Sequence, residues 1–178
     1  MEAATVRAAL STGEHDIADR WIPPEVIKAL SAEKGIKLYS EGGATGEYVK
    51  LNTKRPPLDD VHCRLALTYA FDYATALKIL KINDTYAQGI GMKGPLPSGL
   101  LGYDKSLPDY KQDMAKAKEE LAQCKYDPET SPLDIAWIAE VPARERIALL
   151  MQASFSQLGF PVKVIKTPWA LVSEQVTK

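Results

Sequence analysis

The sequence predicts an α/β fold, because helical and strand-like patterns alternate along its 178 residues. Residues 36–39 and 133–139 alternate apolar and polar side chains as strands do, whereas residues 147–158 place apolar side chains at helical spacing. A helix between two strands implies a crossover connection, which lets the strands lie parallel in one sheet. The expected architecture is a single domain in which helices flank an open, mixed sheet.

The first third of the chain is predicted to contain three helices and three strands. In order, they are a helix over residues 3–11, a strand at 16–18, a helix opened by Pro23–Pro24, strands at 36–39 and 48–51, and a helix that begins near Asp59. The turns between them are marked by glycines, namely Gly13, Gly35 and the pair Gly42 and Gly43. In the last helix Val61, Leu65 and Tyr69 repeat every four residues, so this face is expected to be core.

The remainder of the chain begins with a loop and returns to the α/β pattern. Residues 83–109 are rich in Pro and Gly and are predicted to form one long ordered loop, and loops of this length usually have a function. Asp113 is expected to cap the next helix, because its side-chain oxygen can accept the free amides of the first turn. That helix is predicted to bury Met114, Ala117, Leu121 and Cys124. Gly159 ends the following helix, and a last strand covers 162–164.

Composition and charge favour an ordinary globular domain. A net charge of -1 gives no electrostatic reason to expect a nucleic-acid partner. Cys63 and Cys124 lie far apart in apolar helical contexts, so we expect two small buried side chains in preference to a disulfide or a reactive thiol. The N-terminus has no basic region followed by a long apolar run, which predicts neither a signal peptide nor an anchor in this chain. No window approaches the roughly 20 apolar residues of a membrane-spanning helix.

Residues 52–72 are predicted to form a rigid structural corner. Its members are Asn52, Pro57, Asp59, Arg64 and Asp72. Pro57 and the proline before it cannot donate to a ladder, so they end strand pairing and set the direction of the next helix. We expect Asp59 to cap that helix, with Leu58 packed on Cys63 as a hydrophobic staple. Arg64 is then able to reach a nearby carboxylate or carbonyl group.

Five stretches, in a constant order, carry a family resemblance. They are "ALSTGEHDIA" at 9–18, "YVKLNTKRPPLDDVHCRLALTYAFD" at 48–72, "GPLPSGLLGYD" at 94–104, "DMAKAKEELAQCKY" at 113–126 and "VPARERIALLMQASFSQLGFPVKV" at 141–164. Together they resemble the extracellular solute-binding proteins of the peptide, dipeptide and nickel class (family 5), which serve ABC importers. The chain departs from the family pattern at His62, Cys63, Tyr73 and Lys125, where we expect altered ion pairs and an altered helix end.

The resemblance implies the fold and the role. It covers one lobe of a two-lobed, type II (cluster C) periplasmic-binding-protein fold, so residues 1–178 are expected to be a C-terminal-lobe-like fragment whose second lobe is missing. The implied function is to bind a peptide or similar small solute by hinge closure and to present it to an ABC permease, with no chemistry and no cofactor. The parent protein would then be periplasmic or otherwise extracytoplasmic. A ligand-sensing domain of a transcription regulator is the alternative, and upstream sequence would distinguish the two.

Ligand-binding residues are predicted from position alone, because ligands of open α/β sheets lie at the carboxyl ends of the strands. The candidates are Trp21, Trp137, Glu140, Arg144 and Trp169. Trp21 either stacks on a ligand or packs under its own loop. Arg144 either clamps a carboxylate bidentately or is a solvated residue of the first helical turn. Trp169 either lines the same edge or covers the sheet.

An enzyme is the third hypothesis. His15, Asp16 and Asp19 cluster in the sequence, and a His beside carboxylates can form a metal site or an acid/base pair. Neighbouring strand residues point to opposite faces, however, so His15 and Asp16 are poorly placed to share a ligand. The other histidine, His62, is expected at the surface. The sequence has no phosphate-binding glycine loop, nucleophile elbow or Cys-x-x-Cys motif, so we predict no catalytic residues and no metal ligands.

Overall fold

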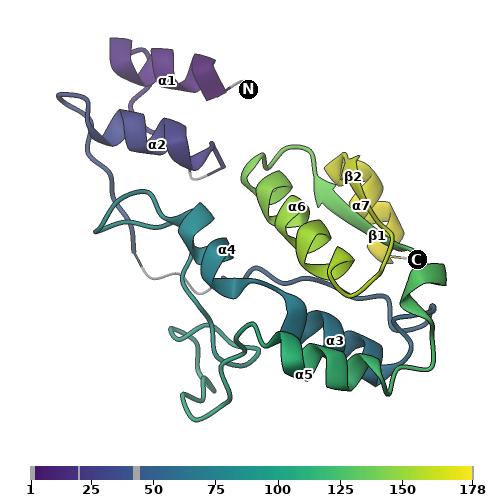
Figure 1. Ribbon diagram of the computed structural model, residues 1–178. Coiled ribbons are helices and arrows are strands. Elements are labelled where there is room, and N and C mark those ends of the chain that lie inside the picture. The colour runs from purple at the N-terminus through teal and green to yellow at the C-terminus, as the bar shows by residue number, and fades with distance from the viewer. Residues whose placement is uncertain (1–2, 20, 42–44, 178) are drawn as a thin grey trace.

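The computed structural model describes residues 3–19, 21–41 and 45–177. Its elements are α1 (Ala3–Thr12), α2 (Pro24–Ser31), α3 (Val61–Ala70), α4 (Tyr73–Leu80), α5 (Met114–Leu121), a 3-10 turn η1 (Pro128–Thr130), β1 (Leu133–Ile138), α6 (Ala143–Ser156), β2 (Val162–Thr167) and α7 (Trp169–Thr177). In space α1 packs with α2, α3 lies against α5, and α6 covers the pair of strands (Figure 1). None of the helices that the structure describes is both long and apolar enough to cross a membrane.

The strands β1 and β2 form a parallel pair, as the strand–helix–strand pattern predicts. Their register runs from Leu133 beside Val162 to Ile138 beside Thr167. The connection between them is α6, which contacts both strands. Because parallel strands run in the same direction, both of them end at one edge of the molecule.

The main core lies where α3, α5 and α6 meet the strands. Small side chains fill the contact between α3 and α5, where Ala66, Ala70 and Ala117 are fully buried. Larger side chains complete this core, including Phe155 of α6 and Phe160, which lies just before β2. Close helix packing follows from the small residues, because helix axes approach most closely where side chains are short.

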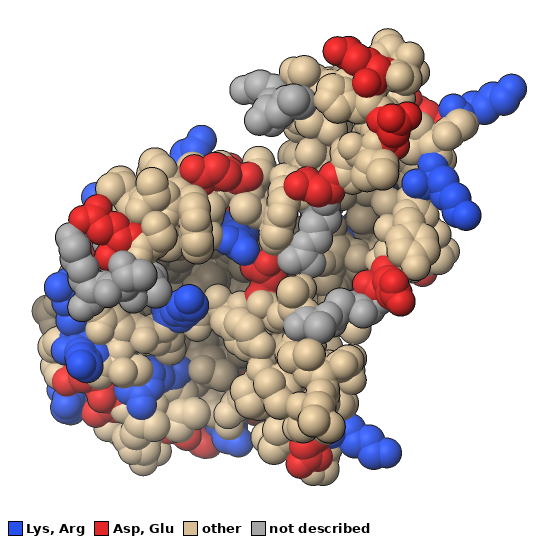
Figure 2. Space-filling view, turned by 180° about the vertical axis from the view of Figure 1, so that it is seen from behind, with Lys and Arg blue, Asp and Glu red and all other residues tan. Residues whose placement is uncertain are grey.

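A second, smaller core holds α1 and α2 together. It contains the buried Ile22, Ile27 and Leu30, together with Ile82, which follows α4. Gln88 Nε2 also donates to Ile22 O at 2.9 Å, which ties this part to the long loop. Seen from behind, the part of the molecule that carries α1 and α2 projects from the rest, and side chains of both charges are interspersed over this face (Figure 2).

Three predicted strands do not form. Residues 16–18, 36–39 and 48–51 have no assigned strand, and the chain runs there as a loop (Figure 1). An alternating pattern marks a segment that can add to a sheet, but a strand also needs a partner to accept its ladder bonds, and the described residues supply none for these three. The predicted turn at Gly42 and Gly43 lies outside the described residues.

The start and the buried face of α3 also differ from the prediction. The cap is Asp60 and not Asp59, since Asp60 Oδ1 accepts from His62 N at 2.8 Å and from Cys63 N at 3.3 Å. With Asp60 as the cap, the predicted staple does not form. A staple uses the residue directly before the cap, and Leu58 lies two residues before it. Val61 is 49% exposed, whereas the buried residues are Cys63, Ala66, Leu67 and Ala70. The face of α3 that packs against α5 is the one whose side chains are short.

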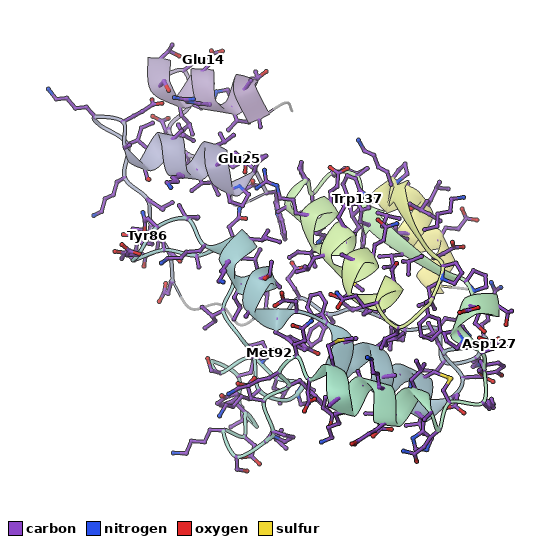
Figure 3. The ribbon with its side chains drawn as sticks, in the orientation of Figure 1. Glu14, Glu25, Tyr86, Met92, Asp127 and Trp137 are labelled. Carbon is purple, nitrogen blue, oxygen red and sulfur yellow. A yellow bond between two sulfur atoms is a disulfide. The ribbon has the colours of Figure 1, made fainter. Side chains whose placement is uncertain are left out.

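The prediction of two free cysteines is wrong. Cys63 and Cys124 form a disulfide with a Cα–Cα distance of 4.9 Å (Figure 3). The sequence separation of 61 residues carried no information about their distance in space, because the chain between them returns α5 to the side of α3. The bond fixes the first turn of α3 to the segment that directly follows α5.

The residues of the predicted corner make local contacts. Asn52 Oδ1 accepts from Lys54 N at 3.1 Å, and the Pro56–Pro57 peptide bond is cis. Arg64 Nη1 donates to Leu58 O at 2.8 Å, so the arginine reaches a carbonyl group as expected. Asp72 caps α4 by accepting from Thr75 N at 2.9 Å.

Asp59 has a different role from the predicted one. Its Oδ2 accepts from Tyr126 Oη at 2.9 Å and from Lys125 Nζ at 3.2 Å. Desolvation raises the pKa of Asp59, but these two hydrogen bonds, the positive charge of Lys125 and a backbone hydrogen bond together hold that pKa below its ordinary value. Asp59 thus joins the start of α3 to the segment after α5, beside the disulfide.

Candidate functional site

A pocket of about 880 Å³ lies at the carboxyl end of the two strands. Most of its lining comes from three segments: the connection between α1 and α2, the stretch from the end of β1 to the first turn of α6, and the start of α7; Val6 of α1 completes it. The parallel register brings two of these segments together, because the residues that follow Ile138 and Thr167 emerge at the same edge. Four of the five predicted ligand-binding residues line this pocket, namely Trp21, Glu140, Arg144 and Trp169.

Arg144 is the best-defined polar group of the pocket. It lies in the first turn of α6, and its guanidinium makes a two-pronged contact with Glu47, from Nε to Oε2 at 3.1 Å and from Nη2 to Oε1 at 3.0 Å. The guanidinium also lies 5.6 Å from the centre of the Trp21 ring. A planar guanidinium held in this way presents two parallel N–H groups, the arrangement that matches a carboxylate.

Glu140 and Trp169 contact each other within the pocket. Both carboxylate oxygens of Glu140 accept from Trp169 N, at 3.2 and 3.0 Å. This amide is the first of α7, and a carboxylate at a helix N-terminus compensates its unpaired amides. Glu140 therefore has a structural role, while the exposed ring of Trp169 offers an apolar surface on the pocket wall.

Trp137 does not line the pocket. It is only 6% exposed within β1, and Lys166 Nζ lies 5.5 Å from the centre of its ring (Figure 3). An inward-facing position in the strand explains its burial, because side chains alternate between the two faces of a strand.

Sequence reasoning missed Glu47. Its contact with Arg144 joins residues 97 positions apart, and Glu47 lies in a segment without helix or strand. No local pattern distinguishes it from the other acidic residues, so only the folded chain reveals the pairing.

The residues considered for catalysis or metal binding are placed as follows. His15 and Asp19 line the pocket and Asp16 does not, but no hydrogen bond joins these three side chains in the described part of the chain. The prediction that His15 and Asp16 point to opposite faces of a strand does not apply, because residues 16–18 form no strand. His62 Nδ1 lies 2.8 Å from Glu120 Oε2.

One group of possible metal ligands occurs in the part of the chain that the structure describes. It consists of Asp60, Cys63 and Cys124, whose ligand atoms lie within 4.8 Å of one another. Both sulfur atoms are bonded to each other in the disulfide, so neither is a thiolate that could hold a cation. The group does not fit a metal in the oxidised protein.

The sequence matches a family model and several curated proteins. The model describes the middle part of bacterial extracellular solute-binding proteins of family 5, and it matches residues 1–178. The chain is 33% identical over 178 residues to the probable D,D-dipeptide-binding periplasmic protein DdpA of Escherichia coli, covering 99% of the chain and 33% of that protein. It is 29% identical over 151 residues to the dipeptide-binding protein of Escherichia coli, covering 82% and 27%. The chain thus spans about a third of the length of the curated relatives it matches.

Solved structures share the fold. The periplasmic binding protein DppA from Helicobacter pylori, in complex with the peptide STSA, superposes with a TM-score of 0.77 at 24% identity, over 96% of this chain and 32% of that one. The oligopeptide-binding protein AppA from Bacillus subtilis, in complex with a nonapeptide, gives 0.75 at 21% identity, over 98% and 36%. At these identities the similarity supports the fold alone.

Proposed function

Because the chain belongs to the bacterial extracellular solute-binding proteins of family 5, we propose that it is one ligand-binding lobe of a receptor that delivers peptides or similar small solutes to an ABC permease. Its fold is that of the type II periplasmic binding proteins, as predicted. The family is one of solute-binding proteins, and we propose that this chain likewise performs no chemistry and uses no cofactor.

The observation that carries the proposal is the pocket around Arg144. A peptide is a small zwitterion with apolar side chains, and this pocket combines a guanidinium already oriented toward a carboxylate with the indole rings of Trp21 and Trp169. Pockets for small molecules commonly pair apolar walls with a few placed polar groups. In this proposal Arg144 contacts the carboxylate of the ligand and the two rings cover its apolar part.

The proposed mechanism is hinge closure with a second lobe. A ligand that contacts both lobes favours the closed state by its difference in affinity for the two states. Residues 1–178 supply one wall of such a site, and the length of the relatives leaves room for another lobe in the parent protein. We propose that the closed form is the one that docks on the permease.

The proposed location is the periplasm or another extracytoplasmic compartment. The disulfide between Cys63 and Cys124 supports it, since disulfides persist in oxidising compartments and are rare in the cytosol. Two of the named relatives, DdpA of Escherichia coli and DppA of Helicobacter pylori, are periplasmic proteins. The alternative, a sensor domain of a transcription regulator, finds no support among these relatives.

Calorimetry on two proteins tests the proposal. The parent protein should bind a dipeptide with a saturable heat signal, and Arg144→Gln in the parent should weaken that binding at least about tenfold, which corresponds to roughly 1.4 kcal/mol. The 178-residue chain alone should bind only feebly, because half of the contacts are absent. Micromolar binding of a dipeptide by the isolated chain would contradict closure between two lobes, and an unaltered affinity in the R144Q parent would contradict the role of Arg144.

A further inference from the structure

The carboxylate that pairs with the guanidinium of Arg144 belongs to the same chain. Glu47 holds both prongs of the guanidinium of Arg144, and Arg144 lines the pocket in which the proposed function places a ligand carboxylate. We infer that Glu47 is an internal competitor, which occupies Arg144 in the empty lobe and gives way to the carboxylate of the ligand. This inference rests on the proposed function and adds a residue that sets the affinity.

Arg144 also has contacts that do not involve Glu47. Its side chain is only 30% exposed, and the Trp21 ring lies against the guanidinium. Its backbone belongs to the first turn of α6, the helix that packs on both strands. When Glu47 leaves, the guanidinium therefore stays at the pocket wall with two donors directed at the vacated position.

Glu47, in contrast, is more exposed than Arg144. Its side chain is 58% exposed, and residues 45–52 form neither helix nor strand. Exposed ion pairs contribute little to stability, because water solvates both charges well. The neighbouring Tyr48 donates from its hydroxyl to Pro95 O at 2.7 Å, so this segment keeps an attachment to the long loop after Glu47 releases Arg144.

A second ion pair on α6 provides the matched control. Arg146 Nη2 lies 2.5 Å from Glu25 Oε1, and this pair also connects the helix to a distant segment, at the end of α2 that faces α6 (Figure 3). Both of its side chains are about half exposed, and neither lines the pocket. Glu25→Gln thus removes one negative charge and one tether from α6 without touching the proposed site.

The test follows the Nε–H signal of Arg144 by NMR while the dipeptide Ala-Ala is added to the 178-residue chain. The inference predicts that Glu47→Gln lowers the apparent Kd about two- to fivefold, the range expected when an exposed ion pair no longer competes. Glu25→Gln should leave the Kd unchanged. The amidated dipeptide, which lacks the carboxylate, should bind equally to all three proteins.

The possible outcomes separate the two proposals. If the Arg144 signal responds to Ala-Ala with the same Kd in the wild type and in E47Q, Glu47 is only a tether and the inference falls, while Arg144 keeps its role. An equal gain in E47Q and E25Q would assign the effect to net charge and also overturn the inference. If the signal responds in neither the wild type nor E47Q, the carboxylate contact of the proposed function fails together with the inference.

Discussion

Removing the disulfide should destabilise the protein by about 4 kcal/mol. Cys63 and Cys124 are 61 residues apart, and a crosslink over that distance lowers the entropy of the unfolded chain by an amount worth about 4 kcal/mol at 25 °C. Small domains are stable by only about 5–15 kcal/mol, so this bond supplies a large share of the total. The double variant Cys63→Ala/Cys124→Ala should therefore unfold at a much lower urea concentration.

Urea unfolding, followed by circular dichroism, measures the effect on three proteins: the oxidised wild type, the reduced wild type and the double alanine variant. The reduced wild type keeps both sulfur atoms, so its loss reports the crosslink. Cys63 is fully buried, so any further loss in the alanine variant reports the cavity left there. The slope of free energy against urea should also rise without the bond, because the unfolded chain expands.

A small effect would refute this reasoning. If the oxidised and reduced wild-type proteins differ by less than about 1 kcal/mol, loop closure does not determine their relative stability. The packing of Ala66, Ala70 and Ala117 between α3 and α5 would then be sufficient to hold these helices together. An unchanged urea slope would show that the disulfide does not restrict the unfolded chain.

Two further predictions concern carboxylates. Desolvation raises the pKa of Asp59, but the hydrogen bonds from Tyr126 and Lys125, the charge of Lys125 and a backbone hydrogen bond together lower it from 3.8. The ionised form of Asp59 therefore stabilises the fold above pH 3.8, and this contribution is lost as the pH falls through the lowered value. Asp59→Asn should flatten the acid side of a curve of unfolding free energy against pH, and a curve identical to that of the wild type would contradict this role. Glu140→Gln should weaken the first turn of α7 by about 0.3–1 kcal/mol, seen as faster hydrogen exchange of the Leu171 and Val172 amides, and should leave the response of Arg144 to Ala-Ala intact. Loss of that response with unchanged exchange would make Glu140 a ligand contact instead.

The sequence was most informative where an element and the partners that it packs with lie close together in the chain. The strand–helix–strand unit of β1, α6 and β2 was predicted because its pattern and its partners are both local. The segments at 36–39 and 48–51 carry the same alternating pattern, but strand formation there depends on a partner that the described residues do not provide. A periodic pattern therefore predicts the capacity for pairing and not the pairing itself.

Tertiary contacts explain the other differences. The buried face of α3 is set by α5, whose short side chains accept Ala66 and Ala70 but leave Val61 outside. The disulfide depends on the same contact between helices. For the pocket, the position of Arg144 after a parallel strand was enough to predict its place, whereas Glu47 comes from a distant loop and carries no signal in the sequence.

The disulfide also has a consequence for proteolysis. The chain between Cys63 and Cys124 contains the whole long loop of residues 83–109, in which Leu101 is fully exposed and offers a protease an easy site. A single cut at such a site would yield two polypeptides that stay covalently joined, because one cysteine of the disulfide lies on each side of the break. Nicked protein would then migrate as one band until a reductant is added, and α5 would be retained beside α3 after the backbone between them is severed.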